Sequence, residues 1–267
     1  MNIKSNVILP IASRLIAIGD IHGCFQEMEI LIKAINMTTA DTLVILGDYI
    51  DRGPDTRAVL DTIIELKESY NVICLLGNHE AMMREAFNFK NSAADRIRCA
   101  KFWLKNGGKA TLDSYMFSTD DLLSEHLNET YLPASIQKHL DLINKMPLHY
   151  ITDTHIFVHA TPAPNKPIQE QDEMELTWRK AGKLDVEHGY THISYKTIVS
   201  GHTAQISGDI LKLSDKNIII DSGCFATGWL TAMIVNDDTY LQASKIETRW
   251  LIDDNKQEEQ DKGLKDD

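Results

Sequence analysis

GDYIDRGP, residues 47–54, is the stretch that decides the fold of the surrounding chain. It follows an apolar run at 42–46 that is typical of a buried strand, and a Gly-Pro pair closes the turn after it. Asp48, Asp51 and Arg52 therefore lie in one loop at the C-terminal end of a strand. Two carboxylates this close together repel each other unless cations hold them. Taken alone, the stretch is as consistent with a charged surface turn as with a site for a metal ion and an anion.

A strand, a polar turn and a helix follow one another three times near the start of the chain. Apolar runs at 14–19, 42–46 and 72–76 predict strands, and apolar residues at helical spacing follow each polar turn. This alternation favours an α/β fold with a largely parallel sheet. Open sheets of this kind place their ligands at the carboxyl ends of the strands. The polar turns are therefore expected to face one common site.

The middle of the chain, about 88–146, predicts several short helices joined by polar connections. We interpret this segment as a helical insertion beside the site, with ordinary core helices as the alternative. Within it, a helix carrying Trp103 is expected to end at the pair Gly107-Gly108.

The second half of the chain predicts further strands. Four apolar runs between 210 and 243 are spaced like an antiparallel meander, which would form a second sheet. Residues 1–252 are expected to form a single domain. The last stretch, 253–267, is rich in acidic residues and almost free of apolar ones, so it predicts a disordered acidic tail.

Composition narrows the classes of function. The 267 residues carry a net charge of −12, which disfavours binding to nucleic acid or to an anionic membrane. No run of apolar residues is long enough for a transmembrane helix, and residues 1–10 do not resemble a signal peptide, so a cytoplasmic location is expected. The four cysteines are far apart in the sequence and predict free thiols rather than a zinc knuckle. We interpret Cys24 and Cys224 as packing residues near the site.

Five strand ends carry side chains that commonly bind metals. Each follows an apolar run, and every donor is nitrogen or oxygen, a mixture that suits zinc, iron, manganese or nickel. Six such residues are too many for one tetrahedral ion, but they suit two ions that share a bridging carboxylate. The six candidates are Asp20, His22, Asp48, Asn78, His159 and His202.

Three motifs in this order resemble a known family. GDIHG at 19–23, GDYIDRG at 47–53 and GNHE at 77–80 match the GDxHG, GDxxDRG and GNHE signature of the phosphoprotein phosphatases, which are calcineurin-like metallophosphoesterases. The resemblance covers about 14–235. FWLKNGG at 102–108 is also similar to a stretch in the bacterial and bacteriophage-type serine/threonine phosphatases of that family.

The resemblance implies a four-layer αββα sandwich of two mixed sheets flanked by helices, and a dinuclear metal centre. One ion would be bound by Asp20, His22 and Asp48, and the other by Asp48, Asn78, His159 and His202. Manganese is the expected metal in vitro, with iron, zinc or nickel as alternatives.

The resemblance also implies the catalytic residues. His79 would be the general acid, held protonated by Asp51, and Arg52 would clamp the phosphoryl oxygens. Arg179 resembles the position of a second phosphate-binding arginine. One departure from the family is the sequence after His159, where a glycine-containing turn is usual and Ala-Thr-Pro stands instead.

These roles imply hydrolysis of a phosphomonoester by direct attack of a hydroxide that bridges two metal ions. The expected substrates are Ser/Thr phosphoproteins or phosphopeptides, with phosphotyrosine as a further candidate, and p-nitrophenyl phosphate in vitro. A dinucleoside tetraphosphate hydrolase, or another small-molecule phosphatase of the same superfamily, is the alternative enzyme. A phosphate-binding protein without activity is the alternative outside catalysis.

Overall fold

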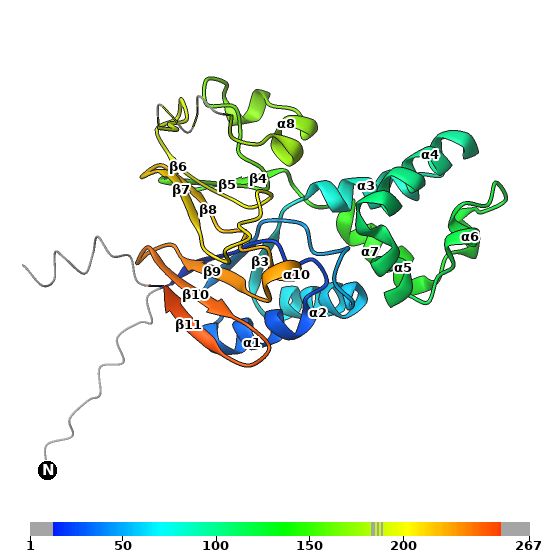
Figure 1. The fold of residues 1–267 in the computed structure, drawn as a ribbon, viewed down its shortest axis with the longest axis horizontal. Helices are drawn as coiled ribbons and strands as arrows, with labels where there is room; N and C mark the ends of the chain where they lie inside the picture. Colours follow the sequence, from blue (N-terminus) through cyan, green and yellow to red (C-terminus); the bar gives the residue numbers. More distant parts are fainter. Residues whose placement is uncertain (1–12, 183–184, 186, 188, 252–267) are drawn as a thin grey trace, which may run out of the picture.

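Two mixed β-sheets stack face to face in the computed structural model, which describes residues 13–182, 185, 187 and 189–251 (Figure 1). The first sheet has the strand order β11-β10-β9-β1-β2-β3, and its strands are β1 (Leu15–Ile18), β2 (Thr42–Ile45), β3 (Asn71–Cys74), β9 (Leu230–Ile234), β10 (Thr239–Ala243) and β11 (Thr248–Leu251). The second has the order β4-β5-β6-β8-β7, and its strands are β4 (His149–Ile151), β5 (His155–Val158), β6 (Thr197–Ser200), β7 (Leu211–Ser214) and β8 (Asn217–Ile219).

Helices cover the outer faces of both sheets, as Figure 1 shows, so the expected α/β sandwich is confirmed. The helices in chain order are α1 (Phe25–Ile35), α2 (Thr56–Ser69), α3 (Asn78–Ala86), α4 (Ala93–Trp103), α5 (Lys109–Ser114), α6 (Thr119–Leu122), α7 (Ala134–Ile143), α8 (Glu173–Trp178) and α10 (Cys224–Thr227). Shorter helical turns are η1 (Leu104–Gly108), η2 (Glu129–Tyr131) and η3 (Ile168–Glu170). None of the helices in the described part of the chain is long and apolar enough to cross a membrane.

Side-chain alternation along each strand separates two cores. In β1, Ile16 and Ile18 face the helices, whereas Ala17 between them points into the space between the sheets. There it lies in one cluster with Phe157 of β5 and Val199 of β6. Because both faces of each central strand are buried, the strands read as continuous apolar runs rather than alternating ones.

The predicted meander at 210–243 is wrong. Its first two strands, β7 and β8, belong to the second sheet, and β8 pairs in parallel with β6. Its last two strands, β9 and β10, lie in the first sheet, where β9 is antiparallel to β1. Local spacing identified the strands but carried no information on which sheet each of them joins. The sequence also gave no signal for the edge strand β11.

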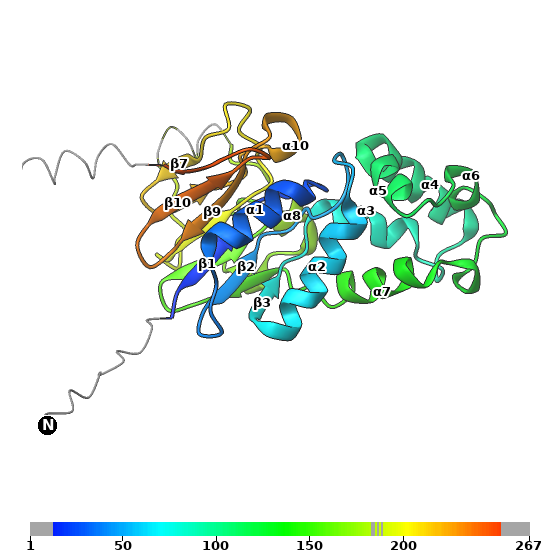
Figure 2. The same cartoon turned by 90° about the horizontal axis from the view of Figure 1, so that it is seen from below.

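The segment 88–146 is helical throughout its regular structure and lies at one end of the molecule, as Figures 1 and 2 both show. α7 packs against α2 and α3, which joins the segment to the first sheet's helical layer. The helix through Trp103 continues as a wide turn, η1, and breaks at Gly107, whose φ of +110° favours glycine. Gly108 is required for another reason, because a Cβ there would lie 2.6 Å from the Trp103 indole.

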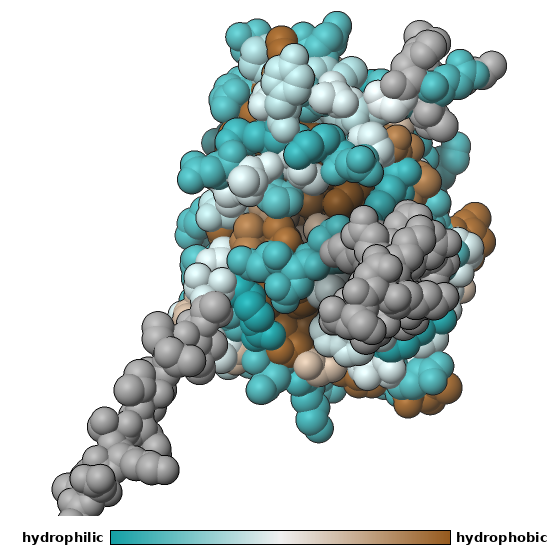
Figure 3. Space-filling view, turned by 90° about the vertical axis from the view of Figure 1, so that its left-hand side faces the viewer, coloured by the Kyte–Doolittle hydropathy of each residue, from teal (hydrophilic) through white to brown (hydrophobic). Residues whose placement is uncertain are grey.

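Hydrophilic residues cover much of the face drawn in Figure 3, in keeping with the acidic composition. Figure 3, which views the molecule from the left of Figure 1, shows hydrophobic residues gathered in the middle of that face with hydrophilic residues around them. The predicted acidic tail, 253–267, lies outside the described residues.

Candidate active site

Asp48 lies at the centre of the site, three residues beyond the end of β2. Its Oδ2 is 3.4 Å from Nε2 of His22, and its Oδ1 is 3.4 Å from Nε2 of His159. His202 belongs to the same group of donor atoms as Asp48 and His159. Strands of both sheets therefore direct their C-terminal residues to one carboxylate, as the strand-end pattern predicted.

A glycine makes this approach possible. A Cβ at Gly77 would lie 2.2 Å from Oδ1 of Asp48, so no side chain fits there. The Asp48 backbone itself has a φ of +52°, in the left-handed region that non-glycine residues rarely occupy. The turn after β2 is thus held in an unfavourable conformation that aims the carboxylate at the histidines.

Burial favours the neutral imidazoles that metal binding requires at the three predicted histidine ligands. Burial lowers the pKa of His22 and of His202 to about 3, and it lowers the pKa of His159 as well. Burial alone would raise the pKa of Asp48, but the surrounding imidazoles outweigh it and hold that pKa below its usual range. Neutral imidazoles and an ionised carboxylate are ligands of Zn²⁺, Mn²⁺ and Fe²⁺.

The donors divide into two groups that share Asp48. The predicted ligand His22 lies in one, beside the general acid His79, and the predicted ligands His159 and His202 lie in the other. The Asn78 side-chain oxygen joins the second group, 2.9 Å from Nε2 of His159 and 3.0 Å from Nδ1 of His202. A carboxylate between two clusters of nitrogen and oxygen donors fits two cations with Asp48 as the bridge.

Asp20 lies at the edge of this arrangement. Its two oxygens each accept the backbone N–H of His202 at 3.1 Å. Its carboxyl group also lies beside Asp221, and burial together with this neighbour raises the pKa of Asp20. The role of Asp20 as a ligand stays a prediction. Sequence reasoning missed Asp221, although it follows the apolar strand β8 just as the predicted ligands follow theirs.

His79 and Asp51 form a buried pair. Nδ1 of His79 is 2.6 Å from Oδ2 of Asp51. Burial alone would lower the pKa of His79, but Asp48 and Asp51 outweigh it and raise that pKa above its usual value. A protonated imidazole beside a metal centre can donate a proton to a leaving oxygen. This geometry supports the predicted role of His79 as general acid.

Two residues of the helical segment donate hydrogen bonds to Asp51 of this pair. Sequence reasoning did not identify either of them as a site residue. Nε1 of Trp103 donates to both oxygens of Asp51, and the hydroxyl of Thr111 donates to Oδ1 of Asp51 at 2.6 Å. Both donors come from residues more than fifty positions along the chain, so local sequence carried no sign of them. The helical segment thus fixes the orientation of the acid's partner.

Arg52 lies over the histidines. Its Nη1 is 2.8 Å from Nε2 of His22 and its Nη2 is 3.0 Å from Nε2 of His79, while its guanidinium stacks 4.5 Å above the Phe225 ring. The guanidinium therefore faces the position where a phosphoryl group would meet the Asp48 cluster. Such a planar, charged donor suits phosphate oxygens.

Arg179 has other partners. Its guanidinium donates to the carbonyl oxygens of Thr161 and Pro162 and forms an ion pair with Asp185 at 2.6 Å. These contacts brace the loop after β5, in which Ala-Thr-Pro replaces the usual glycine turn. The role of Arg179 as a second phosphate clamp stays a prediction.

Glu80 is structural. Its carboxylate accepts the backbone N–H groups of Asp48, Tyr49, Ile50 and Gly77, at 2.8 to 3.3 Å. It thereby joins the turn after β2 to the start of α3. Burial and the charge of Asp48 raise the pKa of Glu80 to about 8. Both oxygens of Glu80 are therefore engaged by backbone donors, which gives the residue a structural role.

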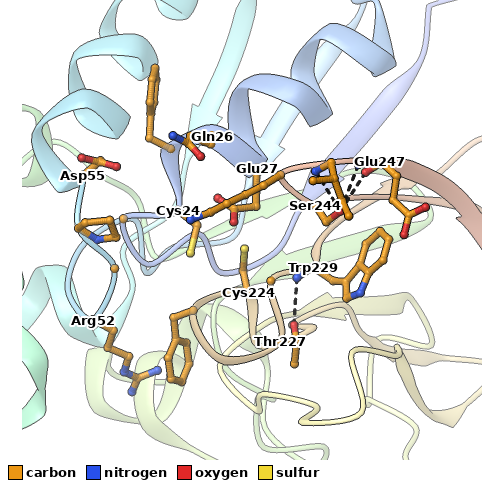
Figure 4. A pocket seen from close by; sticks show the side chains of 18 residues that line it. Cys24, Gln26, Glu27, Arg52, Asp55, Cys224, Thr227, Trp229, Ser244 and Glu247 are labelled. Atoms are coloured by element: carbon orange, nitrogen blue, oxygen red, sulfur yellow. Dashed lines mark hydrogen bonds between the residues drawn. The ribbon is translucent and has the colours of Figure 1, made fainter.

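Two cavities of about 620 Å³ are each lined by a residue that contacts the centre, Arg52 in one and Trp178 in the other. The first, which we call the Arg52 cavity, opens beside Arg52 and is lined by Phe25, Phe225 and Trp229 among others (Figure 4).

The second, which we call the Trp178 groove, is mainly apolar and is lined by Met82, Phe102 and Trp178 among others. It reaches the centre through Trp178, whose carbonyl oxygen is 3.2 Å from Nε2 of His202.

Residues 13–205 match the model of the calcineurin-like phosphoesterase family, which is more than two thirds of the chain and includes every predicted site residue. The chain belongs to this family. It is therefore a metallophosphoesterase, an enzyme class that works with a dinuclear metal centre. The identity of its metals is a separate matter, because the donor set suits several.

Curated relatives match over shorter stretches. A symmetrical bis(5'-nucleosyl)-tetraphosphatase of Wigglesworthia glossinidia brevipalpis is 45% identical over 64 residues, which is 24% of this chain and 23% of the relative. The enzyme of the same name from Vibrio parahaemolyticus is 29% identical over 126 residues, 47% of this chain and 46% of the relative. The chain thus spans about a quarter to a half of the length of these relatives.

Solved structures support the fold over most of the chain. One protein assigned provisionally as a diadenosine tetraphosphatase superposes with a TM-score of 0.58 at 20% identity, covering 88% of this chain and 95% of its own. A serine/threonine phosphatase from Saccharomyces cerevisiae superposes with a TM-score of 0.54 at 14% identity, covering 90% and 81%. At these identities the likeness shows the fold alone.

Proposed function

We propose that this metallophosphoesterase hydrolyses dinucleoside tetraphosphates at the centre around Asp48. The observation that carries the proposal is a pair of cavities that each meet a residue in contact with that centre, Arg52 for one and Trp178 for the other. A symmetrical dinucleotide has a phosphate chain in the middle and a nucleoside at each end, so it needs two flanking pockets. The names of the curated relatives support the same substrate class.

Each cavity has the size and lining that a nucleoside needs. Volumes of about 620 Å³ lie within the usual range for small-molecule sites, roughly 300–1,000 Å³. Aromatic rings suited to stacking on a base line both, with Phe225 and Trp229 in the Arg52 cavity and Phe102 in the Trp178 groove.

The residues of the centre have defined tasks. Arg52 binds and orients the phosphoryl oxygens, since its guanidinium already faces the centre. His79 gives its Nε2 proton to the leaving oxygen, and Asp51 holds the imidazole in place through Nδ1. Two cations held around Asp48 would supply positive charge that acidifies a water and polarises the phosphoryl group.

The His79–Asp51 pair favours a second candidate, the Ser/Thr phosphoproteins. A nucleoside diphosphate leaves readily, whereas a seryl or threonyl alkoxide leaves poorly and needs a proton from a strong, positioned acid. The fully buried Asp51 carboxylate contacts three side-chain donors and holds His79 firmly in place. A good leaving group does not require an acid positioned so firmly. In this case the Trp178 groove would accept an apolar residue of the peptide.

One experiment separates the two candidates. The protein is stripped of metal, reloaded with Mn²⁺ and given diadenosine tetraphosphate, a phosphoserine peptide and p-nitrophenyl phosphate in parallel. We expect the highest kcat/KM for the dinucleotide. A preference for the peptide would reject the dinucleotide proposal and select the second candidate, and activity on none of the three would reject both.

Matched variants test the pockets themselves. Phe102→Ala is expected to raise KM for the dinucleotide about 10-fold, the loss expected for a stacked base, with p-nitrophenyl phosphate hydrolysis unchanged. Tyr131→Ala, which removes an exposed aromatic ring outside both cavities, is the control and should alter neither. An unchanged KM for Phe102→Ala would contradict the assignment of the Trp178 groove.

A further inference from the structure

Three potential metal ligands gather at the Arg52 cavity, outside the centre around Asp48. They are the thiols of Cys24 and Cys224 and the carboxylate of Glu27, whose donor atoms all lie within 4.8 Å of one another. Figure 4 shows the two sulfur atoms pointing toward each other below the Glu27 carboxylate. All three side chains are buried, with exposures of 7%, 2% and 3%.

The fold brings these residues together although the sequence separates them widely. Cys24 immediately precedes α1, and Glu27 lies three residues further along, so both side chains lie on the same face of the first turn. Cys224 is the first residue of α10, where Gly223, with a φ of +65°, turns the chain toward α1. The start of α1 and the start of α10 thus place their donor atoms close together.

Glu27 is the member that packing does not explain. Among the described residues, none forms a hydrogen bond or an ion pair with its carboxylate, although the side chain is 97% buried. Glu27 lines the Arg52 cavity, so its carboxylate is open to an ion from that side although little of the side chain is exposed. A cation between the carboxylate and the two thiols would give it the partner that such groups normally have.

A disulfide accounts for less of the geometry. It would join the two sulfur atoms but leave the Glu27 carboxylate without a partner. The other two cysteines, Cys74 and Cys99, belong to no such cluster within the part of the chain that the structure describes. The combination of two thiols and a carboxylate is therefore specific to this position.

We propose that Cys24, Cys224 and Glu27 bind one Zn²⁺, in addition to the ions at the centre around Asp48. Two thiolates and a carboxylate make three of the four ligands that zinc prefers in a tetrahedral arrangement. The three residues line the Arg52 cavity, so a water from that cavity would complete the set of ligands, and the cavity offers the ion a path of entry.

The bound ion would act on the neighbouring phosphate site. Phe225 follows Cys224 directly, and its ring lies under the Arg52 guanidinium and 5.3 Å from the His22 ring. An ion that ties α10 to the start of α1 therefore fixes the aromatic surface on which Arg52 rests. This role is independent of which phosphate substrate the enzyme takes.

Cobalt provides the test, because a thiolate bound to Co²⁺ gives a charge-transfer absorption that nitrogen and oxygen ligands do not. The reduced full-length protein, preloaded with Mn²⁺, is titrated with Co²⁺. We expect this band to saturate at one equivalent per chain and to disappear when one equivalent of Zn²⁺ is added. The centre around Asp48 offers no thiol, so it makes no contribution to the band.

Variants locate the site. Cys224→Ser and Cys24→Ser are expected to abolish the band, and Glu27→Gln, which keeps both thiols, to weaken Co²⁺ binding by about 10-fold or more. Cys99→Ser is the matched control and should leave the band unchanged. Asp48→Asn should also keep it, so a loss of phosphatase activity and a loss of this site are measured separately.

The proposal is overturned by any of three results. These are the absence of the band in the reduced wild-type protein, its survival in both single cysteine variants, or its loss in Cys99→Ser. Far-ultraviolet circular dichroism checks that each variant is folded. If the cysteine variants fail to fold, Glu27→Gln decides the matter, because an unchanged affinity for Co²⁺ in that variant contradicts the site.

Discussion

Nε1 of Trp103 lies 3.0 Å from Oδ1 and 2.8 Å from Oδ2 of Asp51, so one indole N–H is shared by both oxygens of the carboxylate. Asp51 follows β2, whereas Trp103 ends α4 in the helical segment. The helical segment therefore contributes directly to the group that holds His79, although none of its residues was a predicted site residue.

Trp103→Phe should lower kcat and leave KM nearly unchanged. The variant keeps the ring in the core but removes the donor, and a hydrogen bond to a charged group contributes about 1.5–3 kcal/mol. We expect kcat for the phosphoserine peptide to fall about 10-fold because Asp51 is held less firmly. Steady-state kinetics checks this, and a change confined to KM would contradict the positioning role of Trp103.

His79→Asn should affect substrates according to their leaving groups. Loss of a general acid lowers rates by about 10²–10⁴-fold, and the loss is greatest where the leaving oxygen is most basic. We therefore expect a large decrease for the phosphoserine peptide and a smaller one for p-nitrophenyl phosphate, with metal content unchanged. Equal decreases for the two substrates would refute the assignment of His79 as the acid.

Asp48→Asn should remove metal and activity together. Asp48 is common to both donor groups, and its charge is what the surrounding imidazoles stabilise. We expect elemental analysis after dialysis to find neither ion retained, whereas the exposed control Asp113→Asn keeps both. Full occupancy by two metals in Asp48→Asn would show that Asp48 is not the bridge.

Glu80→Ala should destabilise the fold. The substitution leaves four backbone N–H groups without their acceptor, and losses of this kind in buried networks reach about 3–5 kcal/mol. Urea denaturation measures the free energy of unfolding. The exposed control Glu65→Ala should stay within about 0.5 kcal/mol of wild type, and a similarly small effect at Glu80 would contradict its role.

His139 should make stability depend on pH. Burial lowers its pKa, while Nε2 lies 3.2 Å from Asp61 and Nδ1 bonds to the Tyr115 hydroxyl. The unfolded chain takes up a proton near pH 6.5, but the folded chain does so only at lower pH. The contribution of His139 to folding stability is therefore fully present above about pH 6.5. It is lost as the pH falls through the lowered pKa of His139 in the folded chain.

Denaturation at pH 7.5 and 5.5 tests this linkage. Wild type should lose stability between the two, by at most about 1.4 kcal/mol per pH unit from this one group. His139→Gln should lose less, because the titrating group is gone, whereas the exposed control His126→Gln should behave as wild type. An identical loss in wild type and His139→Gln would show that His139 is not responsible.

The sequence predicted the parts of the site that follow local rules. Polar residues after apolar strands identified Asp48, His159 and His202, because the carboxyl ends of neighbouring strands converge in space. The same rule applied to β8 would have found Asp221. Trp103 and Thr111 follow no such rule, since their contact with Asp51 depends on how helices pack far along the chain.

The fold divides in the same way. The positions of the strands other than β11 were predictable to within a residue or two, because buried runs are visible in composition. The sheet that each strand joins was not predictable, because β8 pairs with β6 and β9 pairs with β1, which are not neighbours along the chain. The meeting of Cys24 with Cys224 is a further case of contact without a spacing signal.

The left-handed backbone at the site limits what evolution can exchange there. His22, Asp48, Asp51, Arg52 and His202 all have φ between +47° and +72°. Asparagine, aspartate and glycine tolerate such angles, whereas branched side chains do not. The backbone conformation alone therefore restricts which residues can replace Asp48 or Asp51. Asn is the replacement that removes the charge while disturbing the backbone least.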